Sequence, residues 1–402
     1  MQYDFTSIID RHGMDALAVD AVGDPRISIA PGPPREGFDL IPMWVADMNF
    51  PTLPDIQEAI IERARHPMFG YYLPRDAYYD SIIRWHRVRK GTEGLTREEI
   101  GYENGVLGGL AAAMQVLGPP GTRVLLHSPT YVGFTGTLKN NGYTIVHSPL
   151  VRDRAGVWRM DLSDMEGHFR EGIRILVFCS PHNPCGRVWE KEEILDMMDL
   201  CRRYDVTVIS DEIWSDILLD GAVHIPTQSV SEDAAGRTVA LYAPSKTFNL
   251  AGLIGAYHII YNEDLRRKIR RQSSLSHYNE MNVLSMHALI AAYSDHGMEW
   301  TDQLREVIGR NVDYACAFSR DHFEGVEIAK PQGTYMLFAD CGGFLKARGK
   351  TLDQLEKAAW QVGCALQDGR QFHGMSHLRI NLALPFTRVK EAFDRLDRYV
   401  FH

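Results

Sequence analysis

The sequence predicts an α/β protein with two domains: a larger one built on a mostly parallel β-sheet flanked by helices, and a smaller α+β one. Through the middle of the 402-residue chain, short apolar runs alternate with helical patterns. The runs are apolar throughout, which is typical of strands buried on both faces by helices. After about Ser285 long amphipathic stretches dominate, so the type of structure changes there.

The strands of the larger domain are predicted from six β-rich runs: Arg123–His127, Tyr143–His147, Ile173–Cys179, Val206–Ile209, Thr238–Tyr242 and Ala256–Ile260. The clearest helix between them is Glu192–Tyr204, which carries apolar residues on one face. In sheets of this kind, ligands bind beyond the carboxyl ends of the strands. The loops that follow these runs are therefore the expected place of a binding site.

The smaller domain is predicted from the C-terminal part of the chain together with the N-terminal segment. Its helical stretches are Met286–Tyr293, Asp302–Arg320, Leu352–Leu366 and Arg388–Tyr399, and its short β-runs are Gly333–Ala339 and Leu378–Leu382. The N-terminal segment is rich in Pro and Gly between Pro25 and Pro54, and we expect it to join this domain. The predicted division places residues 49–285 in the larger domain and residues 1–48 and 286–402 in the smaller one.

Composition and charge exclude several classes of protein. The formal net charge of −9, without any basic run, argues against nucleic acid as a partner. Six scattered cysteines without a Cys-x-x-Cys pair indicate reduced thiols rather than a zinc knuckle or a disulfide framework. No apolar stretch approaches membrane-spanning length, and the charged N-terminus has no signal-peptide core. We therefore expect a cytoplasmic protein with no membrane partner.

Three polar motifs follow three of the apolar runs directly. They are Pro181–Pro184, Ser210–Glu212 and Ala243–Gly252, and they contain Asn183, Asp211 and Lys246. A lone lysine is usually a solvated surface charge, but a lysine at one strand end with Asn and Asp at others is the arrangement that a pyridoxal 5′-phosphate (PLP) enzyme needs. Lys246 is therefore the central candidate.

Asp211 and Asn183 fit this interpretation chemically. Asp211 ends a buried run, where a carboxylate needs a strong partner to stay ionised, and a protonated pyridine nitrogen is such a partner. Asn183, between Pro181 and Pro184, has an amide that can donate to the phenolic oxygen of PLP. Taken singly, each residue has an ordinary structural interpretation: the Asp can cap a helix, and the Asn-Pro pair can form a turn.

Other candidate residues give weaker signals. Asn104–Gly109 opens an Ala-rich helix at Leu110–Leu117, and amides at a helix start hold phosphate well. Tyr131, after the first strand, can stack on a flat ring, although a Tyr there is more often core. Arg379 suits a substrate carboxylate, with a surface salt bridge as the alternative. His373 and His377 lie in a loop-like stretch without a third ligand, so no metal site is predicted.

With these residues assembled, the chain resembles a family. The motifs that carry the resemblance are Pro42–Phe50, Phe69–Tyr71, Ser180–Trp189, Ser210–Ile213 and Ala243–Leu253. They are similar to those of fold-type I PLP-dependent enzymes of the class I/II aminotransferase superfamily, and within it to the MalY/PatB-type cystathionine β-lyase (C–S lyase) branch. The resemblance runs from about Tyr3 to Tyr399 and implies a seven-stranded sheet in the larger domain.

The resemblance implies roles for the residues of the larger domain and its neighbouring subunit. It makes Lys246 the Schiff-base lysine and catalytic residue, and Asp211 the partner of the pyridinium nitrogen. Asn183 would contact the ring oxygen, and Tyr131 would stack on the ring. The backbone amides of Val106 and Leu107, together with Ser245, would hold the phosphate. Tyr71 would reach the phosphate of the neighbouring subunit, which implies a homodimer with shared active sites.

For the substrate, a small L-amino acid, the resemblance implies a second set of contacts. Arg379 would bind the α-carboxylate, with Trp44 and Ala46 lining the entrance. Three positions depart from the pattern. Trp214 stands where the family usually has His or Tyr. Ile254 stands where many aminotransferases, but not this branch, have an arginine. The 367–374 loop is shorter and more polar than the lyase loop.

The leading functional hypothesis is β-elimination on a sulfur-containing L-amino acid such as cystathionine, giving thiol, pyruvate and ammonia. The alternative is aminotransfer between an L-amino acid and a 2-oxo acid, which uses the same Lys, Asp and Arg; Trp214 and the 367–374 loop motivate it. A third hypothesis is regulation through protein binding, as in some relatives. The sequence shows no helix-turn-helix extension, so direct DNA binding is not expected.

Overall fold

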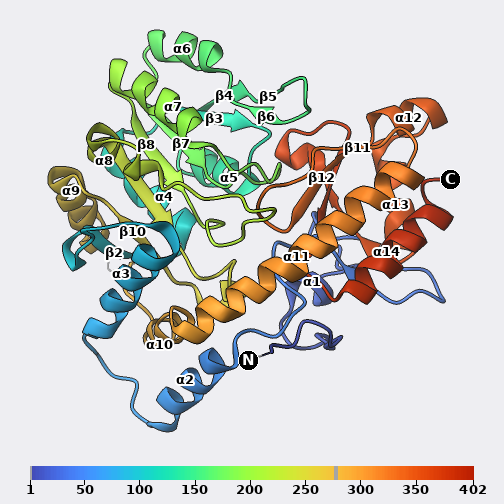
Figure 1. The fold of residues 1–402 in the computed structure, drawn as a ribbon, viewed down its shortest axis with the longest axis horizontal. Helices are drawn as coiled ribbons and strands as arrows, with labels where there is room; N and C mark the ends of the chain where they lie inside the picture. The colour runs from blue at the N-terminus through green and yellow to red at the C-terminus, as the bar shows by residue number, and fades with distance from the viewer. Residues whose placement is uncertain (1, 276–278) are drawn as a thin grey trace. The chain divides into compact units, whose positions relative to one another are not determined.

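The computed structural model describes residues 2–275 and 279–402 (Figure 1). The chain divides into two compact units. The larger unit consists of residues 52–182 and 187–302, and the smaller unit of residues 1–51, 183–186 and 303–402. The division predicted from the sequence, after residues 48 and 285, stays a prediction.

The larger unit contains a seven-stranded sheet with strand order β2-β10-β9-β8-β7-β3-β4. Figure 1 shows β8, β7, β3 and β4 following one another across it. Its strands are β2 (Ile100–Glu103), β3 (Arg123–Ser128), β4 (Thr144–Pro149), β7 (Ile175–Cys179), β8 (Thr207–Asp211), β9 (Thr238–Tyr242) and β10 (Ala256–Ile259). Five of them, from β9 to β4, are parallel, and β10 is antiparallel to both of its neighbours. The predicted mostly parallel, seven-stranded sheet is therefore confirmed.

The register of the parallel strands gathers their carboxyl ends at one edge. Cys179 at the end of β7 pairs with Asp211 at the end of β8, and Asp211 pairs with Leu241 of β9. The main chain continues this pairing beyond β7, where the N–H of Ser180 donates to the carbonyl oxygen of Asp211 at 2.9 Å. The loops that follow these strands therefore start side by side, as the sequence predicted.

The larger unit also contains helices. They are α2 (Pro54–Arg65), α3 (Asp76–Lys90), α4 (Val106–Leu117), α5 (Val132–Asn140), α6 (Leu162–Arg170), α7 (Lys191–Arg203), α8 (Glu232–Arg237), α9 (Glu263–Ser274) and α10 (Val283–Ala292), and a short hairpin of β5 (Val151–Arg152) and β6 (Trp158–Arg159) lies between α5 and α6 in the chain. One hydrophobic core joins α4, α5 and α9 to strand residues such as Val177 and Leu241. Alternate strand positions face away from it: Tyr242 packs edge-on against His86 of α3 at 4.5 Å.

The smaller unit has a four-stranded sheet of order β11-β12-β15-β14 whose pairs are all antiparallel. Its strands are β11 (Glu327–Ile328), β12 (Met336–Asp340), β14 (Gln367–Asp368) and β15 (His377–Asn381); β1 (Ile41–Pro42) pairs separately with β13 (Cys364–Ala365). Its helices are α1 (Leu17–Asp20), α12 (Gly342–Arg348), α13 (Leu352–Gln361) and α14 (Phe386–Tyr399), together with the C-terminal part of α11 (Asp295–His322), inside which the division falls. The predicted smaller α+β structure is therefore present.

One predicted helix is shorter than expected. The stretch Leu352–Leu366 is helical only to Gln361. Gly363 follows with φ of +82°, in the left-handed region that ends helices, and a Cβ there would lie 2.1 Å from the carbonyl oxygen of Asp39. The chain then turns into β13 and β14, and this places Gln367 beside β15.

Within residues 2–275 and 279–402, no helix has the length and apolar character needed to cross a bilayer.

Candidate active site

Lys246 lies in the loop after β9, four residues beyond Tyr242. The residue is partly exposed. The Nζ atom lies 5.5 Å from the ring centroid of Trp214, which is within the range of a cation–π contact. The same amine attracts the carboxyl group of Asp211 electrostatically. The lysine therefore lies near an aromatic face, Trp214 after β8, and attracts the carboxyl group at the end of that strand.

A buried ion pair supports the loop that carries Lys246. The Nζ of Lys90 on α3 donates to Asp216 Oδ1 at 2.7 Å, and both side chains are almost fully buried. Asp216 also accepts from the indole N–H of Trp85 and, at 3.3 Å, from the hydroxyl of Thr247. Because Thr247 adjoins Lys246, this pair anchors the backbone from which the lysine projects. Neither Lys90 nor Asp216 was predicted from the sequence.

Asp211 has an environment that favours a cationic ligand. Burial raises the pKa of its carboxyl group to about 7, against the opposing effects of a hydrogen bond from the Ile213 N–H, 3.0 Å long, and of the Lys246 charge. A positive charge placed against this carboxyl group would restore its ionised form. This is the chemistry that the sequence analysis assigned to a pyridinium partner.

The residue after Asp211 is held rigidly by its own network. The Glu212 carboxylate accepts from Tyr242 and pairs with His224, both at 2.7 Å, and it accepts from the N–H of Thr227 at 2.9 Å. These contacts hold the pKa of Glu212 below its usual value although the group is fully buried. A fixed Glu212 leaves the preceding carboxyl group little freedom to move.

The N-terminus of α4 offers free amide groups for an anion. Gly105 precedes the helix with φ of +78°, and the first backbone bond inside the helix region runs from the N–H of Gly109 to the Gly105 carbonyl oxygen at 3.0 Å. The N–H groups of Val106 and Leu107 therefore come before the helical ladder and point toward its open end. Asn279 braces this turn by accepting from the Asn104 N–H at 2.5 Å.

Tyr131 lies next to this helix start. It immediately precedes α5, and its ring meets Phe134 edge-on at 5.3 Å. A Cβ added to Gly133 would lie 2.3 Å from the Tyr131 ring and 2.9 Å from the Leu107 side chain. Both side chains therefore pack over the bare backbone of Gly133. The structure brings together Tyr131 and Leu107, which the sequence analysis had predicted separately.

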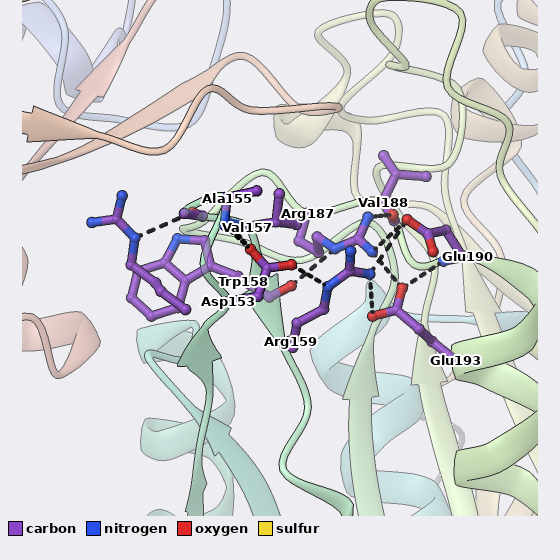
Figure 2. Close-up of polar contacts among 11 residues, drawn as sticks. Asp153, Ala155, Val157, Trp158, Arg159, Arg187, Val188, Glu190 and Glu193 are labelled. Atoms are coloured by element: carbon purple, nitrogen blue, oxygen red, sulfur yellow. Dashed lines mark hydrogen bonds and ion pairs between the residues drawn. The ribbon is translucent and has the colours of Figure 1, made fainter.

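The segment after β7 is fixed by a buried arginine (Figure 2). Arg187 pairs with Glu193 at the start of α7, and with Glu190 at 3.1 Å. It also donates to the Trp158 carbonyl oxygen in the β5–β6 hairpin at 3.0 Å. Arg159 of that hairpin shares the same two glutamates, and Figure 2 shows both guanidinium groups directed at them. The backbone bond from His182 to Arg187 closes the motif at 2.8 Å, so the residues between them form a fixed loop.

Asn183, inside that loop, belongs to the smaller unit together with Arg379. Arg379 on β15 is only 3% exposed. Its Nη1 donates to Asn183 Oδ1 at 3.4 Å and its Nη2 to the Trp44 carbonyl oxygen at 2.9 Å. Nη2 also donates to Gln367 Oε1, and the guanidinium carbon lies 4.3 Å from the centre of the Phe372 ring. A buried guanidinium held by oxygen acceptors is suited to a carboxylate ligand.

The remaining predicted residues lie as follows. The Trp44 indole is buried within the smaller unit and donates to the Ala18 carbonyl oxygen at 3.0 Å, so Trp44 meets Arg379 through its backbone. Ala46 accepts from the Tyr335 hydroxyl through its carbonyl oxygen at 3.0 Å and is partly exposed. Ser245 is half-buried in the Lys246 loop, and Tyr71 is fully exposed. The roles of these four residues stay predictions.

The structure thus assembles two groups of candidate residues, one in each unit. The larger unit holds Lys246, Asp211, Trp214, Tyr131 and the start of α4. The smaller unit holds Arg379, Asn183 and the backbone of Trp44. The sequence analysis missed Gln367 and Phe372 as contacts of Arg379, and only the short, polar 367–374 loop signalled that this region was unusual.

Comparison with known proteins identifies the family. Residues 39–396 match the family described as aminotransferase class I and II. The chain belongs to this family. It is 33% identical over 362 residues to a protein named cystathionine β-lyase PatB from Bacillus subtilis, covering 89% of this chain and 92% of the relative. It is 31% identical over 399 residues to the protein MalY from Escherichia coli, covering 97% of this chain and 96% of the relative.

A solved structure has the same fold. The crystal structure of cystalysin from Treponema denticola, described as containing a PLP cofactor, matches with a TM-score of 0.90 at 28% identity, covering 99% of this chain and 98% of that one. The predicted fold-type I architecture and the predicted resemblance to the MalY/PatB-type branch are both confirmed.

Proposed function

We propose that this protein is a PLP-dependent carbon–sulfur β-lyase that acts on a sulfur-containing L-amino acid such as cystathionine and releases a thiol, pyruvate and ammonia. The observation that carries the proposal is the electrostatic attraction between Lys246, in the loop after β9, and the buried carboxyl group of Asp211 at the end of β8. The names of the relatives support it, because PatB is named a cystathionine β-lyase and cystalysin is described with PLP.

The residues present fit PLP. A carboxyl group whose pKa is raised by burial suits the protonated ring nitrogen, and the free amides of Val106 and Leu107 suit the phosphate. Tyr131 would cover the ring, Ser245 would add a hydroxyl to the phosphate, and Asn183 would meet the ring oxygen. When bound, PLP supplies an electron sink that makes the α-proton of an amino acid acidic.

The chemistry then depends on residues of this chain. Arg379 would bind the α-carboxylate of the substrate and so fix the orientation of the bonds at Cα. The amine of Lys246 would remove the proton from Cα, and the thiolate at Cβ would leave with the electron pair of its C–S bond. Hydrolysis of the remaining enamine carbon skeleton gives pyruvate and ammonia.

The test is to incubate the PLP-loaded protein with L-cystathionine and to measure pyruvate and free thiol together. We expect equimolar amounts of both products, and the absence of both would overturn the proposal. The aminotransferase alternative makes a different prediction. With a 2-oxo acid supplied as acceptor, it yields a 2-oxo acid that keeps the whole side chain of the donor, without release of thiol.

We further propose that the protein works as a homodimer with shared active sites. Four apolar residues between α2 and α3 support this: Met68, Phe69, Tyr71 and Leu73 are 69%, 57%, 109% and 87% exposed. An apolar stretch of this kind favours contact with a second surface, and Tyr71 would then lie at the neighbouring subunit's phosphate.

A complementation experiment tests the shared site. Tyr71→Ala and Lys246→Ala are each expected to impair activity. If sites are shared, unfolding and refolding the two variants together creates heterodimers in which one site has both residues, and activity returns. Failure to recover activity in a mixture that light scattering shows to be dimeric would overturn sharing. A monomeric wild-type protein would overturn the dimer itself.

We also infer a cytoplasmic location, which the chain's thiols support. Cys179, Cys185, Cys201, Cys316, Cys341 and Cys364 are all present as thiols rather than disulfides, and five of them are buried. Reduced thiols are typical of cytosolic proteins. Expression as a fluorescent fusion, followed by fractionation, would test the location.

A further inference from the structure

The turn that precedes α4 is held by the side-chain amide of Asn279. Its Oδ1 accepts from the Asn104 N–H at 2.5 Å, and its Nδ2 donates to Glu103 Oε2 at 2.8 Å and to the Tyr102 carbonyl oxygen at 2.9 Å. The three partners are consecutive residues at the end of β2 and the start of the turn. Because one partner is a donor and the other two are acceptors, the orientation of the amide is determined.

The Glu103 carboxylate is in turn fixed by His258 of β10. His258 Nδ1 donates to Glu103 Oε1 at 2.6 Å, and both side chains are almost fully buried. In the antiparallel pairing of β2 and β10, His258 lies directly opposite Gly101. A Cβ on Gly101 would lie 2.2 Å from the His258 ring, so the ring needs the bare backbone of this glycine to reach Glu103. The second carboxylate oxygen is therefore held in place for Asn279.

These contacts order the backbone immediately before α4. The Asn104 N–H donates to Asn279, and the Gly105 N–H donates to the Glu103 carbonyl oxygen at 2.9 Å. Gly105 has φ of +78°, and α4 begins at the next residue. The fixed turn thus leads directly into the amide groups to which the proposed function assigns the cofactor phosphate. An anion that binds to an ordered turn avoids the entropy cost of ordering its backbone.

We propose that Asn279 is a positioning residue for the cofactor: through Asn104 and Glu103 it holds the turn before α4 in its phosphate-binding conformation in the apoprotein. The inference rests on the proposed function, because it takes the amides of Val106 and Leu107 to be the phosphate ligands. It goes beyond that function in assigning the order of the turn to a side chain 175 residues from Asn104 in the chain. A merely structural role for Asn279 predicts equal effects on ligands with and without a phosphate.

The substitution Asn279→Ala tests this inference, because it removes these contacts without changing the charge. Asn282→Ala is the matched control: it removes the same kind of side chain nearby, where Asn282 caps α10 by accepting from the N–H groups of Leu284 and Ser285. Each apoprotein would be titrated with PLP and with pyridoxal, which lacks the phosphate, and binding would be followed by the absorbance of the ligand. Inorganic phosphate would be added separately, and the shift of the thermal unfolding midpoint would be measured.

We expect Asn279→Ala to bind PLP about 10-fold or more weakly, because the phosphate must then order the turn. Its affinity for pyridoxal should change by less than about twofold, and the stabilisation of the apoprotein by inorganic phosphate should disappear. Asn282→Ala should unfold at a lower temperature because it loses a helix cap, but it should keep the wild-type ratio of PLP to pyridoxal affinity. Equal losses for PLP and pyridoxal in Asn279→Ala would overturn the inference.

An exchange of donor and acceptor tests the contact with Glu103, and it replaces Asn279→Ala if that variant does not fold. Asn279→Asp can still accept from Asn104 but sets a second carboxyl group against Glu103, so we expect weaker PLP binding. Adding Glu103→Gln restores a donor between the two side chains and the wild-type net charge, and most of the PLP affinity should return. Asn282→Asp adds the same charge nearby while keeping a cap, and it should bind PLP like the wild type. Failure of the double variant to recover PLP affinity would overturn the inference.

The wild type separates this inference from the proposed function. A wild-type apoprotein that binds PLP no more tightly than pyridoxal contradicts the phosphate role of the α4 amides, and the inference falls with it. A wild type that prefers PLP, together with an Asn279→Ala variant that keeps the full preference, overturns the role of Asn279 alone.

Discussion

The carboxyl group of Asp211 and the amine of Lys246 attract each other across the ends of two adjacent parallel strands. Asp211 is the last residue of β8, and Lys246 follows β9 by four residues. This attraction only partly offsets the effect of burial, which still raises the pKa of Asp211 to about 7. The apoprotein therefore contains a carboxyl group that a cationic ligand would stabilise.

This relationship gives a pH prediction for the apoprotein. A carboxyl group with a raised pKa contributes stability that is complete below its ordinary value of 3.8 and is lost as the pH rises through about 7. We expect Asp211→Asn to remove this loss of stability at high pH, because the asparagine side chain stays neutral. The variant apoprotein should melt several degrees above the wild-type apoprotein at pH 8, with a much smaller difference at pH 5.

Addition of PLP should reverse the order of the two melting temperatures, so that the wild type melts above Asp211→Asn. The wild type is expected to gain stability because Asp211 can pair with the protonated ring nitrogen, whereas the variant gains less and loses most of its activity. The measurement is thermal unfolding of both proteins at two pH values with and without PLP. A wild-type apoprotein that is more stable than Asp211→Asn at pH 8 would contradict the assignment.

The packing of Tyr131 over Gly133 makes a second prediction, with a matched control in the same helix. Gly133→Ala would place a methyl group 2.3 Å from the Tyr131 ring, so we expect the ring to move and PLP to bind roughly 10-fold more weakly. Gly136→Ala, also in α5, meets nothing within 4 Å. It should leave PLP affinity unchanged and stabilise the helix by about 0.5–1 kcal/mol.

Fluorescence titration of the apoproteins with PLP, together with chemical denaturation, measures both effects. Similar PLP affinities for the two variants would show that Tyr131 does not cover the cofactor.

The buried pair of Lys90 and Asp216 makes a third prediction. Removing one partner leaves the other charge buried, which costs about 3–5 kcal/mol. We therefore expect Lys90→Met to be strongly destabilising, and Lys90→Met combined with Asp216→Asn to be less destabilising than the sum of the single changes. Because Asp216 also holds Thr247, PLP loading should fall in parallel.

Denaturant unfolding of the four proteins in this double-mutant cycle gives the coupling energy. Additive effects would show that the two side chains do not stabilise each other.

These cases show which parts of the molecule the sequence could predict. The strands β7, β8 and β9 were predictable because a buried parallel strand is a continuous apolar run, and the polar residues after each run then had to meet at one edge. Asp211 and Lys246 follow from that logic. Tyr131 was predicted to stack on the cofactor ring, but its packing over the bare backbone of Gly133 beside Leu107 could not be predicted from the sequence.

The contacts that the sequence could not predict depend on tertiary register. Lys90 and Asp216 are 126 residues apart, and nothing local marks either of them as buried. Gln367 meets Arg379 only because the preceding helix stops at Gln361 and a two-residue strand follows, whereas the amphipathic pattern continued to Leu366. The two contacts of Trp44 also depend on register, because its indole donates to Ala18 and its carbonyl oxygen accepts from Arg379, while its place at the entrance stays a prediction.

Glu356 on α13 makes the last prediction. Burial, with the nearby charges of Asp368 and Asp353, raises its pKa to about 7, and Arg370 compensates only partly. Its contribution to stability is complete below the ordinary value of 4.5 and is lost as the pH rises through about 7. Glu356→Gln keeps the neutral form at every pH, so the variant should melt above the wild type at pH 8 and close to it at pH 5. The exposed Glu324→Gln is the control and should show no such pH dependence. A lower melting temperature for Glu356→Gln at pH 8 would instead show that the ionised Glu356 stabilises the turn that holds Gln367 through its attraction to Arg370.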